Sequence, residues 1–325
     1  MRSHDPWHDL ARDRRPRRFR DLKKVPVLPS LITLGNLFFG FLAMAKVADA
    51  VMLSARGQQH PEFSSDVQHV LEVASILVFV AMVFDALDGT VARLTRQTTK
   101  FGAQLDSLAD VVTFGVAPAF LAKVLIEFHH RPPIQLLPFH PKIYYVAAAV
   151  YVLCAALRLA RFNVESAGPS PEDHKEFKGL PSPAAAAIVC SLVAFKCAPP
   201  DPSELSHWLL PDGARDAIVQ ALPLVLVFVG LLMVSRLPYP HVMYQLVRKR
   251  HSFPYLLGLV GIVGFAALEW QFALLLLTQV YLLTGIGLGL WRLVTTGSLR
   301  KRGLEHVVQL ENEPKAPTPQ GPTLN

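Results

Sequence analysis

Four aspartates between residues 85 and 110 form the pattern in this sequence that is best suited to chemistry. They belong to the frame D-x2-D-G-x2-A-R-x8-G-x3-D-x3-D, whose fixed positions are Asp85, Asp88, Gly89, Ala92, Arg93, Gly102, Asp106 and Asp110. On a helix, the first two aspartates share one stripe with the alanine, and the last two share another stripe. Crowded carboxylates between apolar segments are costly unless cations neutralise them, and oxygen ligands suit hard cations. The frame therefore predicts a site for Mg²⁺ or Mn²⁺, with Ca²⁺ as a third option.

The frame resembles the signature of the CDP-alcohol phosphatidyltransferases, integral membrane enzymes of phospholipid biosynthesis, and all eight positions match. Three further stretches resemble the phosphatidylserine synthase branch of that family: LPSLITLGNLFFGFLAM at 28–44, FGAQLDSLADVVTFGVAPA at 101–119, and RLARFNV at 158–164 followed by FKGLPSPAAA from residue 177. The resemblance covers roughly residues 28–250. It implies a metal-dependent enzyme that transfers the phosphatidyl group of CDP-diacylglycerol to the hydroxyl of L-serine and releases CMP.

For this reaction, the aspartates are expected to divide into metal ligands and a base. Asp85, Asp88 and Asp106 are the expected primary ligands. Asp110 is the expected general base, with metal ligation as its second role. Ser107 is predicted to point off the carboxylate stripe, and no serine or cysteine of the frame has an evident activating base. We therefore expect direct displacement rather than an enzyme-bound intermediate.

Other positions are expected to contact the nucleotide of CDP-diacylglycerol. The small residues of the frame leave room for it against the backbone, and the arginine of the frame could pair with the pyrophosphate. Each position also has a structural alternative, because small residues allow close helix packing, arginines anchor at membrane interfaces, and a buried asparagine can bond a neighbouring helix. The expected nucleotide contacts are Asn36, Asp88, Gly89, Ala92, Arg93 and Gly102.

A second group of residues is expected to bind the acceptor or a phosphate. Arg158 and Arg161 are three residues apart at the end of an apolar segment, so they share a helix face. One guanidinium could hold the serine carboxylate and the other a phosphate, and the spacing does not assign which. The alternative is that both arginines only anchor the segment at the membrane interface. The expected serine- and phosphate-binding residues are Arg158, Arg161, Asn163 and Lys178.

The elements that must position these residues are apolar helices. The chain is 51% hydrophobic and 18% charged with a mean hydropathy of +0.33, and the charges are segregated from the apolar runs. This predicts an all-α, polytopic integral membrane bundle of about eight transmembrane helices. The fifth and seventh segments are short for a span, so six spans with one buried hairpin are the alternative, and Glu269 is expected in a solvated turn. The eight segments are 31–48, 70–87, 107–126, 144–159, 183–195, 218–234, 255–268 and 272–290.

The distribution of Lys and Arg predicts the orientation of the chain in the membrane. With both termini in the cytoplasm, 24 of the 32 Lys and Arg residues fall on inner segments, as the positive-inside rule expects. This places the aspartate frame on the cytoplasmic side of the cytoplasmic (inner) membrane, where a cytidine nucleotide and serine are available.

Four regions are predicted along the chain. They are a basic cytoplasmic segment at 1–27, the phosphatidyltransferase core at 28–250, a C-terminal transmembrane hairpin at 251–302, and a disordered tail at 303–325. The basic segment could lie on anionic lipid or be a disordered, topology-setting tail. Nucleic acid is not an expected partner, because no fold capable of base readout accompanies the charge. The expected partners are CDP-diacylglycerol, L-serine and membrane lipid, and a homodimer is left open.

Two rival interpretations remain at this point. Within the family, the acceptor could be glycerol 3-phosphate, inositol phosphate or choline, because only the flanking stretches favour serine. A protein of another class, a cation transporter, would also carry carboxylates inside the membrane. The fixed offsets of Gly89, Ala92 and Arg93 argue against a transporter, which has no need of them.

Overall fold

The computed structural model describes residues 27–56, 63–95, 99–129, 142–166, 179–199, 213–235, 237, 264–265 and 267–311. The regular elements of these residues are all helical. They are α2 (Val27–Arg56), α3 (Phe63–Leu94), α4 (Lys100–Asp110), the π-helical turn η3 (Val111–Val116), α5 (Ala117–His129), α6 (Lys142–Ser166), α7 (Ser182–Cys197), α9 (Ala214–Val234) and α12 (Trp270–Glu311). The predicted basic segment 1–27 lies, apart from its last residue, outside the described residues.

Six stretches of the described chain are long and apolar enough to cross a membrane. The prediction of an all-helical, polytopic membrane protein is therefore confirmed, but the described residues contain six candidate spans and not eight. The predicted segment 183–195 corresponds to α7, which is apolar but shorter than the ~20 residues that a span requires. The predicted segment 255–268 lies mostly outside the described residues. The six candidates are Leu28–Ala55, Ser65–Leu94, Phe101–His129, Lys142–Glu165, Ala214–Val234 and Trp270–Gly289.

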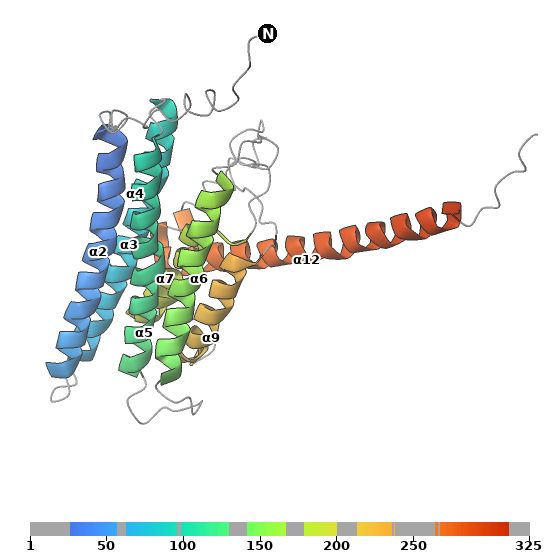
Figure 1. Cartoon of the computed structure of the whole chain (residues 1–325). Coiled ribbons are helices and arrows are strands. Elements are labelled where there is room, and N and C mark those ends of the chain that lie inside the picture. The colour runs from blue at the N-terminus through green and yellow to red at the C-terminus, as the bar shows by residue number, and fades with distance from the viewer. Residues whose placement is uncertain are drawn as a thin grey trace, which may run out of the picture.

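The helices form a bundle in which α7 has the most interior place. α2 and α3 pack side by side, the run from α4 through η3 to α5 lies against them, and α6 packs on α9 (Figure 1). α7 contacts α3, α5, α9 and α12, and most of its residues are buried. A continuous apolar core joins these helices, and its largest fully buried side chains include Tyr144, Tyr151 and Phe114.

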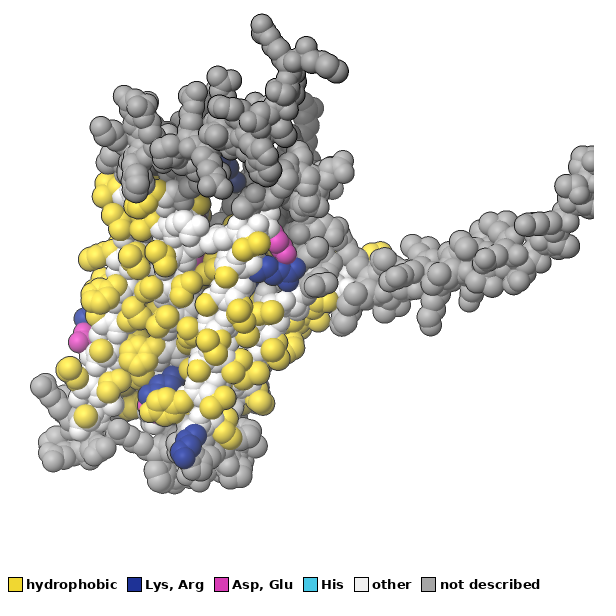
Figure 2. Space-filling view, viewed as in Figure 1, with side chains coloured by type: hydrophobic (Ala, Val, Ile, Leu, Met, Phe, Trp, Pro, Cys, Tyr) yellow, Lys and Arg dark blue, Asp and Glu magenta, His cyan; other side chains and the backbone are white. Residues whose placement is uncertain are grey.

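The outer surface of the bundle is apolar. Hydrophobic side chains cover most of the face seen in Figure 2, and few charged side chains interrupt them. Large apolar residues such as Leu31, Phe41, Leu153 and Leu157 are more than half exposed. An exposed apolar surface of this extent indicates contact with lipid.

A π-helical turn interrupts the third candidate span directly after Asp110. Pro118 has no N–H with which to continue an α-helical bond to the Phe114 carbonyl, and the Tyr151 hydroxyl donates to that carbonyl across 3.0 Å. Thr113, also in η3, donates to the Asn36 carbonyl of α2 across 3.3 Å. The turn is thus fixed to α6 and α2, and it sets the position of Asp110. π-Helical turns are frequent at functional sites.

The segment before α7 is held on the end of α9. The Gly179 N–H donates to the Leu237 carbonyl at 2.9 Å, and the Leu180 N–H donates to the Leu232 carbonyl at 3.1 Å. Gly179 has φ +95°, a left-handed conformation that favours glycine. Proline follows at 181 and 183, where it can begin a helix without losing a hydrogen bond. The first turn of α7, with Ser182, is therefore rigidly placed.

α12 differs from its prediction at both ends. Glu269 is only 9% exposed and is not in a solvated turn, because its carbonyl accepts the Ala273 N–H and the start of α12 packs on α7. There, Gln271 donates to Glu72 across 3.1 Å. The helix continues to Glu311 and projects beyond the bundle (Figure 1), so it includes residues 303–311 of the predicted disordered tail. That stretch contains no proline to end the helix.

Candidate active site

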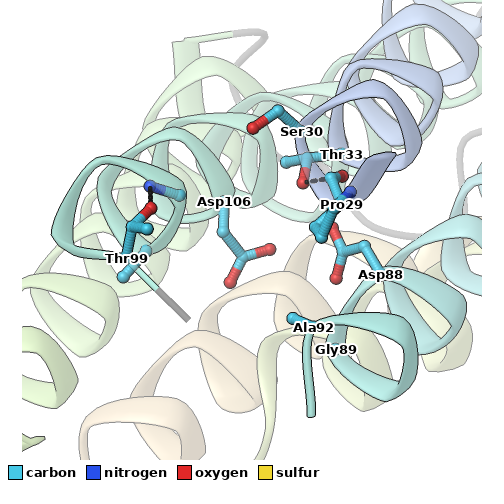
Figure 3. A pocket seen from close by; sticks show the side chains of 10 residues that line it. Pro29, Ser30, Thr33, Asp88, Gly89, Ala92, Thr99 and Asp106 are labelled. Atoms are coloured by element: carbon cyan, nitrogen blue, oxygen red, sulfur yellow. Dashed lines mark hydrogen bonds between the residues drawn. The ribbon is translucent and has the colours of Figure 1, made fainter. Parts of the chain in front are cut away.

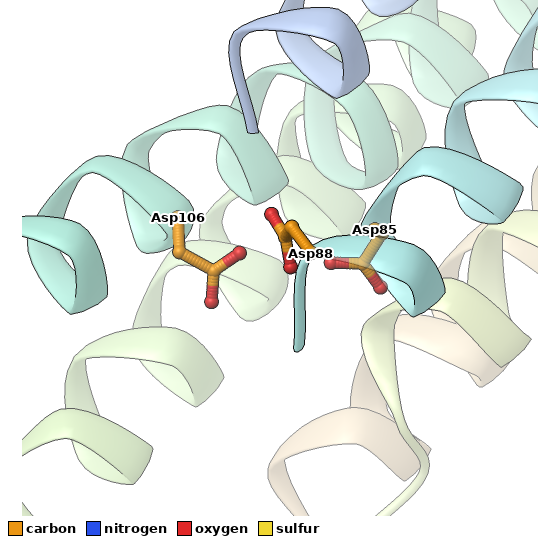
Figure 4. A group of neighbouring side chains, drawn as sticks. All are labelled: Asp85, Asp88 and Asp106. Carbon is orange, nitrogen blue, oxygen red and sulfur yellow. The ribbon is translucent and has the colours of Figure 1, made fainter. Parts of the chain in front are cut away.

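Three carboxylates converge where the C-terminal part of α3 meets α4. One ligand oxygen from each of Asp85, Asp88 and Asp106 lies within 4.8 Å of the other two. Asp88 lies between the others in Figure 4, and the three side chains point toward one another. Asp88 is buried, whereas Asp85 and Asp106 are half-buried. Because cation–oxygen bonds of about 2.0–2.6 Å place ligand oxygens up to about 5 Å apart, one divalent cation can contact all three.

Two of these oxygens lack any other partner in the described part of the chain. Asp88 Oδ2 and Asp106 Oδ1 are shielded from solvent, and no described residue donates a hydrogen bond to them. A buried carboxylate oxygen without a donor costs free energy, which a bound cation would offset. The donor set is all oxygen, which suits Mg²⁺, Mn²⁺ or Ca²⁺. The three aspartates therefore fit a divalent cation.

Asp110 is not one of this group of three, although its carboxyl lies within hydrogen-bonding reach of Asp85. It lies one turn beyond Asp106 at the end of α4, and it is buried. Asn36 Nδ2 donates to Asp110 Oδ1 across 3.3 Å, and the Arg158 guanidinium is close enough to interact with Asp110 electrostatically. The fourth carboxylate thus has hydrogen-bonding and cationic neighbours of its own, and it faces a cavity.

That cavity has a volume of about 500 Å³ and carries both signs of charge on its walls. The aspartates of the frame supply the negative charge, and Arg93 and Arg158 supply the positive charge. Leu159, Phe162, Pro181 and Pro183 form an apolar side. A small polar molecule with charges of both signs, or a phosphate, fits such a lining.

A second, smaller pocket of about 200 Å³ opens on the other side of Asp88 and Asp106. Figure 3 shows these two side chains entering it from α3 and α4, with Ser30 and Thr33 of α2 beside them. A Cβ atom added at Gly89 would meet nothing within 4 Å, so the backbone of α3 is open to a ligand there. The other lining residues are Pro29, Ala92, Thr99, Gly102 and Ala103.

The start of α4 shapes the mouth of this smaller pocket. Thr99 caps α4, because its hydroxyl accepts the Gly102 N–H at 3.1 Å. A Cβ atom at Gly102 would lie 3.3 Å from that hydroxyl, which is a tight contact. Of the predicted nucleotide contacts, Asp88, Gly89, Ala92 and Gly102 line this pocket.

Arg93 and Asn36, also predicted to contact the nucleotide, lie elsewhere. Arg93 is exposed, lines the larger cavity, and donates from Nε to the Gly89 carbonyl at 2.9 Å. Asn36 is fully buried and lines neither pocket, since its side chain is directed to Asp110. The interhelical bond, which was the alternative for Asn36, is the contact observed.

The predicted acceptor residues are also separated by the structure. Arg158 lines the larger cavity and donates to the Ser182 hydroxyl. Arg161 lines neither pocket, and its Nε donates to Glu165 on the same helix at 2.7 Å. Asn163 accepts a hydrogen bond from the Ser107 hydroxyl at 3.0 Å. Lys178 lies outside the described residues.

Several lining residues were not predicted as site residues. Ser107 was expected to point away from the carboxylates, but it lines the same cavity as Asp106, because the wall of that cavity extends around α4 to α6. Thr33 lines the smaller pocket, and Ser182 lines neither pocket but accepts a hydrogen bond from Arg158. Both come from stretches whose resemblance to the family was the available signal. Phe162 lies in the resembling stretch 158–164 and had the same signal.

Comparison with known proteins gives a family and several relatives. The family model described as CDP-alcohol phosphatidyltransferase matches residues 26–229. A CDP-diacylglycerol–serine O-phosphatidyltransferase of Helicobacter pylori is 32% identical over 66% of this chain and 72% of its own length. A protein of the same name in Methanocaldococcus jannaschii is 32% identical over 65% of this chain and 81% of its own length. An archaetidylserine synthase of Methanothermobacter thermautotrophicus is 33% identical over 66% of this chain and 70% of its own length.

Proposed function

Because the chain belongs to the CDP-alcohol phosphatidyltransferase family, we propose that it transfers the phosphatidyl group of CDP-diacylglycerol to the hydroxyl of L-serine and releases CMP. The observation that carries this proposal is the cluster of three aspartates beside a cavity that holds a fourth carboxylate and a guanidinium. Serine is favoured as the acceptor because the names of the three relatives above share it, although one of them differs in the lipid.

In the proposed reaction, the serine oxygen forms a bond to the lipid-side phosphorus, and the bond from that phosphorus to the bridging oxygen of CMP breaks. Asp110 accepts the hydroxyl proton, and Asn36 orients its carboxylate. Asp85, Asp88 and Asp106 hold a divalent cation, Mg²⁺ or Mn²⁺ with Ca²⁺ as a third option. When bound, the cation neutralises the charge of the diphosphate.

The two pockets accommodate the two substrates on either side of the aspartates. The nucleotide lies in the smaller pocket, where Gly89, Ala92 and Gly102 present little side-chain bulk. The diphosphate reaches Arg93, and serine lies in the larger cavity with its carboxylate on Arg158. We assign a role outside the cavity to three further residues, which bind serine or phosphate as it approaches: Arg161, Asn163 and Lys178.

We further propose that the chain crosses the cytoplasmic membrane eight times with both termini and the active site on the cytoplasmic side. The support for this is the hydropathy of α7 and of segment 255–268, together with the excess of Lys and Arg on the inner segments.

An acceptor panel tests the proposed activity. Membranes that contain the protein are supplied with CDP-diacylglycerol, Mn²⁺ and one labelled alcohol at a time: serine, glycerol 3-phosphate, inositol phosphate or choline. Serine is expected to yield labelled lipid and CMP, and the others are not. Label in the lipid from another alcohol would assign that acceptor instead, and no lipid product from any alcohol would favour the cation transporter.

A further inference from the structure

Among the described residues, Arg93 and Arg158 line the larger cavity, and Arg158 is the half-buried one of the two. The orientation of its guanidinium therefore matters for a ligand in that cavity. Its electrostatic neighbours include the carboxylates of Asp110 and Asp85 and the side chain of Tyr281 of α12. A guanidinium has five N–H donors in a fixed planar fork. One of them is used by the Ser182 hydroxyl. The others remain for a ligand in the cavity, provided that the plane of the fork is fixed.

Ser182 is well suited to fix that plane. Its side chain is fully buried, and it begins α7 between two prolines that line the cavity. The preceding backbone is held on the end of α9 by the Gly179 and Leu180 hydrogen bonds. A hydroxyl on such a rigid segment determines where the guanidinium of Arg158 can point.

α12 also brings a side chain near Arg158. A buried hydrogen bond of 2.7 Å joins Thr278 of α12 to Ser191 of α7. Tyr281 lies three residues farther along, on the same face of α12, and Leu282 is buried in the main core. Tyr281 packs against that core within electrostatic reach of Arg158.

We infer that Ser182 and Tyr281 are positioning residues that hold the Arg158 guanidinium for the acceptor, so that α12 is a working part of the acceptor site. This inference rests on the proposed function for the identity of the acceptor. It extends the site beyond residues 26–229, the part of the chain that matches the family. α12 is thereby more than a membrane anchor.

The test compares Michaelis constants of the full-length protein in lipid nanodiscs. Loss of one hydrogen bond to a binding group corresponds to a change in affinity of roughly 2- to 12-fold. Ser182→Ala is expected to raise the KM for serine by this factor, and Tyr281→Phe, which removes a hydroxyl within electrostatic reach of Arg158, is expected to raise it as well. Both variants are expected to leave the KM for CDP-diacylglycerol within about twofold. Ser182→Thr, which keeps the hydroxyl, restores the serine KM. Thr284→Val, an exposed change one turn farther along α12, is the matched control.

A double-mutant comparison separates positioning from a general loss of structure. If Ser182 acts through Arg158, adding Ser182→Ala to Arg158→Lys changes the serine KM by less than about twofold. Full additivity of the two changes, or equal rises in both Michaelis constants, would overturn the inference. So would a serine KM that is unchanged in either Ser182→Ala or Tyr281→Phe.

The inference and the proposed function can fail separately. If the wild-type protein uses another alcohol, the choice of serine is wrong, and the same variants are measured with that alcohol. A selective rise in its KM would still support the positioning role of Ser182 and Tyr281. If Ser182→Ala does not fold, Tyr281→Phe still decides the result, because it removes no buried hydroxyl from α7.

Discussion

At the scale of single residues, the four aspartates are not equivalent. Asp85, Asp88 and Asp106 offer oxygens within 4.8 Å of one another, while Asp110 lies deeper and accepts a hydrogen bond from Asn36. Among the described residues, orphaned oxygens occur on Asp88 and Asp106 but not on Asp85 or Asp110. The distinction between ligands and base therefore has a basis in the surroundings of each carboxylate.

Replacement of a ligand aspartate by asparagine tests the metal role. Asp106→Asn keeps the volume but removes a charge, so the fold should survive while activity falls below about 1% even at saturating Mn²⁺. Initial rates of lipid synthesis measure the effect. The control is Asp49→Asn, because Asp49 is about half exposed and pairs with Lys46 at the surface. Near-normal activity of Asp106→Asn would contradict the assignment.

Replacement of Asp110 tests the role of base. A positioned proton acceptor contributes about 10²–10⁴-fold to the rate, so Asp110→Asn should lower kcat on that order. CDP-diacylglycerol binding, measured by titration calorimetry, should weaken less than in Asp88→Asn. Loss of metal-dependent nucleotide binding in Asp110→Asn, with retention in Asp106→Asn, would reverse the two roles.

The sequence predicted these aspartates and the small residues near them, because the frame is local and its spacing alone identifies the family. Contacts between elements that are distant in the chain could not be predicted from the sequence. The direction of Asn36 toward Asp110 depends on how α2 packs on η3, and the bond from Arg158 to Ser182 depends on the placement of α7. Arg161 and Arg158 share a helix face but differ in partners, since Glu165 is available to only one of them.

At the scale of elements, the first turn of α7 is the part most sensitive to backbone change. Gly179 and Gly213 both have positive φ values, of 95° and 86°. A Cβ atom at Gly179 would also meet the Met233 and Ser235 carbonyl oxygens, the latter at 2.8 Å, whereas one at Gly213 would meet nothing within 4 Å. The segment before α7 therefore has little room for a side chain.

Alanine at each glycine tests this difference. The free energy of unfolding should fall by about 1–2 kcal/mol in both variants, because alanine disfavours the left-handed backbone conformation. In Gly179→Ala it should fall by roughly 1–3 kcal/mol more, because the added methyl group overpacks the segment. The three described cysteines are buried, so a thiol-reactive dye reports unfolding on heating. Equal melting temperatures of the two variants would show that α7 can move to accommodate the new methyl group.

Hydropathy predicted the all-helical class but not the residues at which the helices begin and end. The third candidate span begins at Phe101 and includes a π-helical turn, where the predicted segment began at 107. The reason is that polar residues of the frame occupy the first turns of α4 and lower the apparent hydropathy there. Only the tertiary contacts of Thr113 and Tyr151 reveal the π turn.

At the scale of the whole molecule, the apolar exterior and the six candidate spans support a membrane enzyme, and the proposed orientation can be measured. Thr95→Cys, after α3, should be labelled by an impermeant thiol reagent only from the cytoplasmic side. Ala55 is an exposed residue at the C-terminal end of α2, and Ala55→Cys should be labelled only from outside. The buried native cysteines provide a low background. Labelling from the opposite sides would invert the proposed topology.

The central claim is that the aspartate cluster catalyses phosphatidyl transfer to serine. The most direct measurement follows CMP and phosphatidylserine together in the purified protein, with CDP-diacylglycerol, serine and Mn²⁺. The account predicts that wild type forms the two products in equal amounts, that omission of serine abolishes both, and that Asp106→Asn forms neither. CMP release that continues without serine, or phosphatidylserine formation by Asp106→Asn at the wild-type rate, would contradict it.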